Sequence, residues 1–320
     1  MNIDQREEFR KLLAMEGNIR SHESLIKDLQ AEIQPLSEYE FLLFLQDALA
    51  YSRDVAAREN DPFFYKLLSP SRQIPYLIDL YYSIDNNSGN YIITPHRWSK
   101  IKDLLDEIER TYVANVVFSE KIENVEDYNK AILASNTHKD YFSNIDLVFI
   151  EQVIDKLDSI IGPYNSIIQN QFGFSLEDVL AFILYVASRF SDNKCEVFYY
   201  SDFLIDCVSR EAIDSIISFF QYHPETLKDK TIYYASPQLY LDYPLIKIGD
   251  KYMCASARFL WSALYRRLDK FLSKNIPDSY KKNKAIAAEN KVLSLCKKLF
   301  DSSGLNVPPK TGTNVPPVAE

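Results

Sequence analysis

The sequence predicts a mainly α-helical protein, and three observations lead to this fold class. Glycine is scarce, with 7 residues among 320, which argues against glycine-rich phosphate loops and turn-dense β-sandwiches. Apolar residues recur at three- and four-residue steps through most of the chain before Pro224, as in amphipathic helices. Runs of β-branched and aromatic residues bounded by turn formers are clear only after Pro224. We therefore expect a multi-helical N-terminal domain, then a small α+β segment with one β-hairpin, then a disordered C-terminal tail.

The helices expected from this periodicity follow one another along the chain. They span 4–33, 37–58, 76–84, 98–118, 125–134, 144–161, 162–171 and 175–190, with amphipathic stretches at 201–207 and 210–222. Pro35 ends the first helix, because proline has no N–H with which to continue one. Capping-box patterns open two others, at Ser37-x-x-Glu40 and at Ser175-x-x-Asp178. The helix after Ser175 is apolar on most sides, which predicts a place at the centre of the core.

The expected β-structure is confined to the last third of the chain. Residues 231–235 (TIYYA) and 243–255 (YPLIKIGDKYMCA) are rich in strand formers, and Gly249-Asp250 is a turn that folds the second run into a hairpin. Two helices follow at 257–272 and 282–300, and the Pro- and Gly-containing residues beyond them cannot build a core. The expected organisation is a helical domain at 1–225, a hairpin with basic helices at 226–300 and a disordered tail at 301–320.

Several enzyme classes are disfavoured by motifs that the sequence lacks. No Walker A loop, GxGxxG, GxSxG or HExxH pattern occurs. The four cysteines fit neither a disulfide framework nor zinc spacing, and the four histidines lie at no metal-ligand spacing, so no metal site is expected. The N-terminus is charged and has no apolar signal core, and no apolar run approaches the ~20 residues that span a bilayer. These features predict a cytoplasmic protein with reduced thiols and no membrane contact.

Charge is segregated along the chain. Ten basic and three acidic residues lie between Arg266 and Lys298, a net charge of +7, whereas the first 265 residues carry −15. Such segregation predicts that the segment 266–298 contacts DNA or RNA and that the acidic helical body contacts a protein partner. The candidate nucleic-acid-binding residues are Arg266, Arg267, Lys270, Lys274, Lys281, Lys282 and Lys284. Aromatic residues among them suit base stacking, namely Trp261, Tyr265, Phe271 and Tyr280. The alternative is a solvated helix face whose long side chains only cover apolar surface.

Glu289 is the single acidic residue in the basic and apolar helix 282–300. It lies three residues after Ile286 and four before Leu293, on an apolar stripe that continues to Cys296 and Phe300. If that stripe is buried, the carboxylate needs a cation or a metal, because an unpaired buried charge costs several kcal/mol. The alternative is an exposed glutamate that pairs with a lysine on the same helix.

Residues 230–300, with their hairpin, small-residue turn and Glu289, resemble the region leading into a PD-(D/E)xK nuclease domain of the restriction-endonuclease-like class. In that family a glutamate on the helix before the catalytic sheet helps to hold Mg²⁺, which implies a vestigial metal-site role for Glu289. The family pattern then requires an Asp on one strand and a (D/E)xK on the next, and neither follows Phe300. No catalytic residue is expected, and no cofactor, with Mg²⁺ implied only if a downstream nuclease domain exists.

These observations predict the helical sensor or linker portion of a bacterial defence-type, nuclease-associated protein. The chain as given is expected to be catalytically inactive and to bind nucleic acid non-specifically. Both a truncated chain and a complete chain with a disordered tail fit the sequence. The alternative is a helical scaffold or protein–protein interaction protein with no nucleic-acid role, and a third hypothesis is an enzyme whose active site has no recognised motif.

Overall fold

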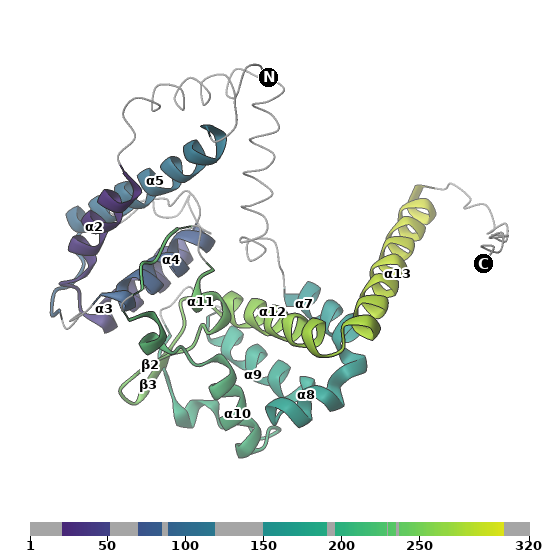
Figure 1. Cartoon of the computed structure of the whole chain (residues 1–320). Coiled ribbons are helices and arrows are strands. Elements are labelled where there is room, and N and C mark those ends of the chain that lie inside the picture. The colour runs from purple at the N-terminus through teal and green to yellow at the C-terminus, as the bar shows by residue number, and fades with distance from the viewer. Residues whose placement is uncertain are drawn as a thin grey trace.

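The computed structural model describes residues 21–51, 70–84, 89–118, 150–190, 196–228, 230–234 and 237–303. Over these residues the protein is mainly α-helical with one small antiparallel sheet, as the sequence predicts (Figure 1). Several expected features lie outside the described residues: the start of the first helix, the end of the second, the helix at 125–134 and the tail beyond Ser303.

The first group of helices lies together at one side of the molecule (Figure 1). It consists of α2 (His22–Ile33), α3 (Glu38–Tyr51), α4 (Pro70–Ser83) and α5 (Pro95–Phe118). The Ser21 hydroxyl accepts a hydrogen bond from the Ser24 amide at the start of α2, and α3 begins directly after Ser37. Helix α4 starts earlier than the expected residue 76, because Pro70 occupies the first helical position, where no N–H is needed.

The second group follows from residue 150 onward. It consists of α7 (Ile150–Lys156), the π-helical turn η2 (Leu157–Ile161), η3 (Gly162–Tyr164), α8 (Asn165–Phe172), α9 (Leu176–Arg189), η4 (Tyr200–Phe203), α10 (Arg210–Phe220), η5 (Pro224–Leu227) and α11 (Leu239–Asp242). The expected capping box opens α9, with the Ser175 hydroxyl accepting from the Asp178 amide and the Asp178 carboxylate accepting from the Ser175 amide. Leu184 is 47% exposed, so α9 has one solvent-facing side and does not lie at the centre of the core as expected.

In the described part of the chain, no single helix is both long and apolar enough to cross a bilayer. Only one pair of described helices, Ile150–Phe172 with Leu176–Arg189, is long and apolar enough when taken together, and an 86° bend separates its two members.

The sheet joins the expected hairpin to a strand that the sequence did not reveal. Strands β2 (Ile246–Ile248) and β3 (Lys251–Met253) pair antiparallel across the Gly249-Asp250 turn, where Gly249 has a φ of 61°, so the hairpin prediction is confirmed. Strand β1 (Phe198–Tyr199) pairs antiparallel with the other edge of β3. The strand expected at 231–235 is wrong: 231–234 form no strand, and the buried Tyr234 packs against α4 and α5.

The described residues form two hydrophobic cores that share the third strand. One core joins α2–α5 to residues between Tyr222 and Phe259, and the other joins α7–α10 to α12 (Ala257–Asn275). Successive residues after Lys251 alternate between them: Tyr252 and Cys254 belong to the second core, Met253 and Ala255 to the first. Both cores therefore draw on both sides of residue 225, and the expected domain boundary does not separate them.

Two buried polar side chains tie α3 and α4 to distant segments. The Gln46 amide donates to the carbonyl oxygens of Glu196 and Cys254 and accepts from the Glu196 amide. The Asp79 carboxyl, 1% exposed, accepts from the Tyr222 hydroxyl and from the backbone amides at the start of α11. Because these groups are buried, losing either side chain would leave several polar atoms without a partner.

Asp79→Ala is expected to lower the free energy of unfolding by about 3 kcal/mol, because it strands one buried hydroxyl and two amides. Denaturant unfolding followed by circular dichroism measures the change. Gln34→Ala, at the end of α2, is the control and should change stability by less than about 0.5 kcal/mol. A loss for Asp79→Ala no larger than that of the control would contradict the role of this carboxyl.

The same carboxyl should make stability depend on pH. Burial raises the pKa of Asp79 to about 7, against hydrogen bonds from Tyr222, Tyr240 and Leu239 that lower it. The folded protein then holds a proton that the unfolded chain releases near pH 4, so this contribution is full at low pH and is lost as pH rises through about 7. The stability of the native protein relative to Asp79→Asn should therefore fall between pH 5 and pH 8, and a constant difference would count against the raised pKa.

Candidate interaction site on the C-terminal helix

The last helix, α13 (Pro277–Ser303), leaves the body of the protein after a sharp bend from α12 (Figure 1). Its first turns are held to the second core through Tyr280, which is fully buried and donates its hydroxyl to Asp269 of α12 over 2.6 Å. Burial and the Asp269 carboxylate raise the pKa of the Tyr280 hydroxyl far above its ordinary value, so it remains a donor. The Asn283 amide also donates to the Tyr164 hydroxyl over 2.8 Å.

The side of α13 that faces the body is polar and basic. Lys284 pairs with Asp269, and Lys291, farther along the helix, pairs with Asp155 of α7 over 2.7 Å. Ala287 lies between these two lysines along the helix and packs against the second core. These contacts fix the rotation of α13 about its own axis.

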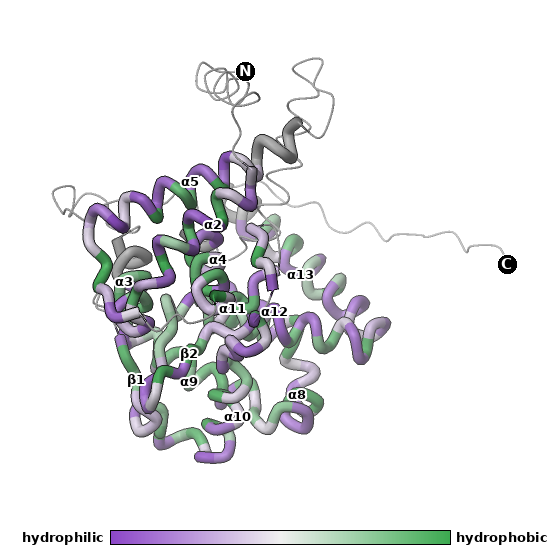
Figure 2. The backbone as a smooth tube through the Cα atoms, turned by 60° about the vertical axis from the view of Figure 1, so that its left-hand side comes forward, coloured by the Kyte–Doolittle hydropathy of each residue, from purple (hydrophilic) through white to green (hydrophobic). Residues whose placement is uncertain are grey.

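The outward side of α13 is apolar. Ile286, Val292, Leu293 and Leu295 are 44–58% exposed, and Cys296 is an exposed free thiol. Figure 2 shows hydrophobic residues along α13 where it extends beyond the rest of the molecule. Helices on protein surfaces usually turn the apolar side inward, so α13 is inverted relative to that rule. We call Ile286, Val292, Leu293 and Cys296 the outward face; Leu295 lies four residues after Lys291 and therefore on the anchored side of the helix.

Glu289 lies within the outward face and is exposed. Of the two alternatives that the sequence left open, the structure shows the exposed glutamate, because the stripe that holds it faces solvent. An exposed carboxylate is hydrated and needs neither a metal nor a buried cation. Within the described ranges, no three His, Cys, Asp or Glu side chains are grouped so that they could hold a metal ion.

Three of the seven candidate nucleic-acid-binding residues are engaged inside the protein. Arg266 pairs with Asp242 over 2.8 Å and donates to the Leu241 carbonyl. The Arg267 guanidinium lies 3.7 Å from the centre of the Phe219 ring and 4.3 Å from that of Tyr243. Burial lowers the pKa of both arginines. Arg266 and Arg267 are therefore half-buried and held by contacts within the protein, and Lys284 is held by Asp269.

The other four candidates form an exposed basic corner where α12 meets α13. Lys270, Lys274, Lys281 and Lys282 are exposed, and none has an ion pair with a residue that the structure describes. The aromatic residues expected to stack on bases are not displayed beside them. Trp261 and Tyr280 are buried, while Tyr265 and Phe271 are partly buried and pack against the second core. The corner can attract phosphate by charge, but these rings do not form a stacking surface.

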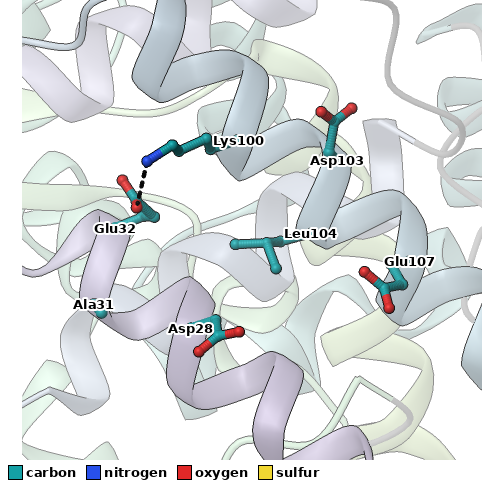
Figure 3. Close-up of a pocket in the computed structure, with 7 residues that line it drawn as sticks. All are labelled: Asp28, Ala31, Glu32, Lys100, Asp103, Leu104 and Glu107. Atoms are coloured by element: carbon teal, nitrogen blue, oxygen red, sulfur yellow. Dashed lines mark ion pairs between the residues drawn. The ribbon is translucent and has the colours of Figure 1, made fainter. Parts of the chain in front are cut away.

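A shallow acidic hollow of about 350 Å³ lies between α2 and α5 (Figure 3). Its carboxylates are Asp28, Glu32, Asp103 and Glu107, around the side chain of Leu104. Lys100 pairs with Glu32 over 3.5 Å across the hollow. This hollow is one acidic patch on the helical body, for which the sequence predicts a protein partner.

A second hollow of about 460 Å³ lies where α8, α10 and α12 meet. Ser215, Ser218 and Arg267 contribute polar groups to its lining, and the Asp214 carboxylate there accepts from the Tyr200 hydroxyl. No histidine or lysine stands beside either serine in this lining to act as its base.

The anchors of α13 could not be found from sequence. Asp155 and Lys291 are 136 residues apart, and nothing in the local pattern of either indicates the pair. Asp269 reads as one acidic residue within a basic segment, yet it holds both Tyr280 and Lys284.

The comparisons with known proteins give no relative: no protein-family model, no curated protein and no solved structure matches this chain.

Substitutions at Asp269 and Glu289 should change the free energy of unfolding by different amounts, because Asp269 anchors α13 and Glu289 lies on its outward side. Asp269→Ala should lower the free energy of unfolding by about 1–3 kcal/mol, because it leaves the buried Tyr280 hydroxyl without its acceptor. Glu289→Ala should change it by less than about 0.5 kcal/mol, because this carboxylate is exposed. Chemical unfolding of the two variants tests both values. A large loss from Glu289→Ala would show that this residue is buried or paired in solution.

Proposed function

We propose that this chain is the non-catalytic helical sensor and linker portion of a cytoplasmic, nuclease-associated protein, and that it joins a protein partner through the outward face of α13. The observation that carries the proposal is the orientation of α13. The helix presents an apolar side to water while two of its lysines, Lys284 and Lys291, pair with the body. Exposed apolar side chains gathered on one element are typical of a surface that another protein covers.

The anchors explain why α13 does not turn its apolar side inward. Rotating the helix would break the Lys284 and Lys291 ion pairs and remove Tyr280 from the second core. Burying a tyrosine is worth about 1.5–3 kcal/mol, by analogy with other large side chains. Exposing the outward face is therefore a stable arrangement of the chain by itself.

The resemblance of residues 230–300 to the region leading into a PD-(D/E)xK nuclease domain supports the outward side of α13 as the side that a partner covers. In that family the helix with the glutamate precedes the catalytic sheet, so the side that carries Glu289 is the one on which such a domain would pack. The described residues supply no further carboxylates that could hold Mg²⁺ with Glu289. The chemistry would belong to the partner or to a downstream domain.

A photo-crosslinking residue placed on the outward face tests the proposal. Val292→benzoylphenylalanine, introduced in the cells that produce the protein, should give a discrete protein adduct on irradiation. Leu204→benzoylphenylalanine is the matched control, because Leu204 is 50% exposed and lies outside α13. Equal labelling from the two positions, or none from position 292, would remove the support for a partner at α13.

Non-specific nucleic-acid binding is a second candidate function, favoured by the four exposed lysines at the α12–α13 corner. Their positive charge would release counterions from DNA phosphates without reading sequence. The acidic body would repel a polyanion elsewhere, which favours contact through this corner.

Fluorescence anisotropy with duplex DNA should show weak binding at ~50 mM salt and a slope of about −3 to −4 in log K against log salt, as for four phosphates. Reversing Lys270, Lys274, Lys281 and Lys282 to Glu should abolish it. Replacing Lys247 and Lys251 of the hairpin with Glu is the control and should leave DNA binding unchanged. These two lysines lie over the Tyr252 and Tyr39 rings. Added Mg²⁺ or Mn²⁺ should give no cleavage. Crosslinking at position 292 without DNA binding would favour the scaffold function with no nucleic-acid role.

A further inference from the structure

We infer that the outward face of α13 binds an acidic amphipathic helix of another protein, with carboxylates at both ends of the contact and one basic residue at its centre. This inference rests on the proposed function and specifies the chemistry of the partner. It follows from three features of the helix: the shape of the apolar face, the charges at its ends and the charge at its centre.

The apolar face has the shape of a helix-binding stripe. Ile286 and Leu293 are seven residues apart, and Val292 and Cys296 extend the face to one side. From residue 286 to residue 296 the stripe is about 15 Å long. Side chains at this spacing interdigitate with those of a second helix packed alongside.

Lysines stand at both ends of the stripe. Lys281 and Lys282 precede it, Lys297 and Lys298 follow it, and all four are exposed without an ion pair to any described residue. A partner with carboxylates at its two ends would satisfy these charges, and a partner with basic ends would be repelled.

The centre of the stripe is negative. Glu289 stands between Ile286 and Leu293, so a partner that covers the apolar face also covers this carboxylate. Covering it without a cation would be costly, and a lysine or arginine at the middle of the partner removes that cost. The hydrocarbon of a bilayer offers no such cation, which disfavours insertion of this face into a membrane.

A second copy of α13 fits this charge pattern poorly. In a parallel pair each lysine end meets the same end of the other helix, and in an antiparallel pair it meets the opposite end, which is also basic. Like charges meet in both orientations, so the partner is a different helix.

Two synthetic peptides test the inference with the full chain. Both are amphipathic helices of about 18 residues, roughly the length from Lys281 to Lys298, with leucines on one side. The first has glutamates at its ends and a central lysine, and the second has lysines at its ends and a central glutamate. Anisotropy titrations should show the first peptide binding at least about tenfold more tightly than the second. The preference should shrink as salt rises.

Variants locate the binding on α13. Val292→Asp and Leu293→Asp should abolish binding of the first peptide, while Leu204→Asp, at an exposed site outside α13, should leave it unchanged. Glu289→Lys should weaken binding of the first peptide and strengthen binding of a version of that peptide whose central residue is glutamate. Circular dichroism confirms that each variant is folded, and because these positions are exposed, loss of the fold is not expected.

Four results would overturn the inference. Equal binding of the two peptides would remove the charge preference. Binding to vesicles of equal parts phosphatidylcholine and phosphatidylglycerol that Val292→Asp abolishes would assign the face to a membrane. Sedimentation showing a dimer that Leu293→Asp dissociates would assign it to a second copy. A crosslinked partner at position 292 whose contacting segment is not an acidic helix contradicts this inference alone, whereas the absence of any crosslink contradicts the proposed function.

Discussion

The two hydrophobic cores share one short strand, and the rest of the described structure depends on that sharing. Residues 252–255 send alternate side chains into opposite cores, so the position of this strand is set from both sides. A shift by one residue would exchange the two sets, placing Met253 where Tyr252 packs. The hairpin turn at Gly249 and the pairing with β1 hold the register against such a shift.

This constraint carries through to the C-terminal helices. Ala255 donates its amide to the buried Tyr240 hydroxyl, and α12 begins two residues later under a Ser256 cap. Helix α12 then crosses the second core and delivers Asp269, the residue that anchors α13. The direction of α13 and the side it turns to solvent are therefore consequences of a strand more than twenty residues earlier in the chain.

Local signals were sufficient for much of this architecture. The Ser175 capping box and the Gly249-Asp250 turn each depend on residues close in sequence, and the structure confirms both. Strand β1 was missed because two residues are too short for a periodic pattern and its partner lies about fifty residues away. The exposure of Glu289 could not be decided for a related reason: periodicity shows that apolar residues share a side, but not whether that side is covered. The burial of Arg267 depends on Phe219 and Tyr243, which no spacing rule connects to it.

The anchors of α13 also determine how motion of the body reaches its far end. Among the side chains that the structure describes, the last one that joins α13 to the body is Lys291, which pairs with Asp155 of α7. The helix continues for twelve residues beyond it, to Ser303. That free length is about 18 Å, so a tilt of about 10° at the anchor moves the tip by about 3 Å. Because the Lys291–Asp155 ion pair joins α13 to α7, a displacement of α7 would tilt α13 and move any partner bound near its end.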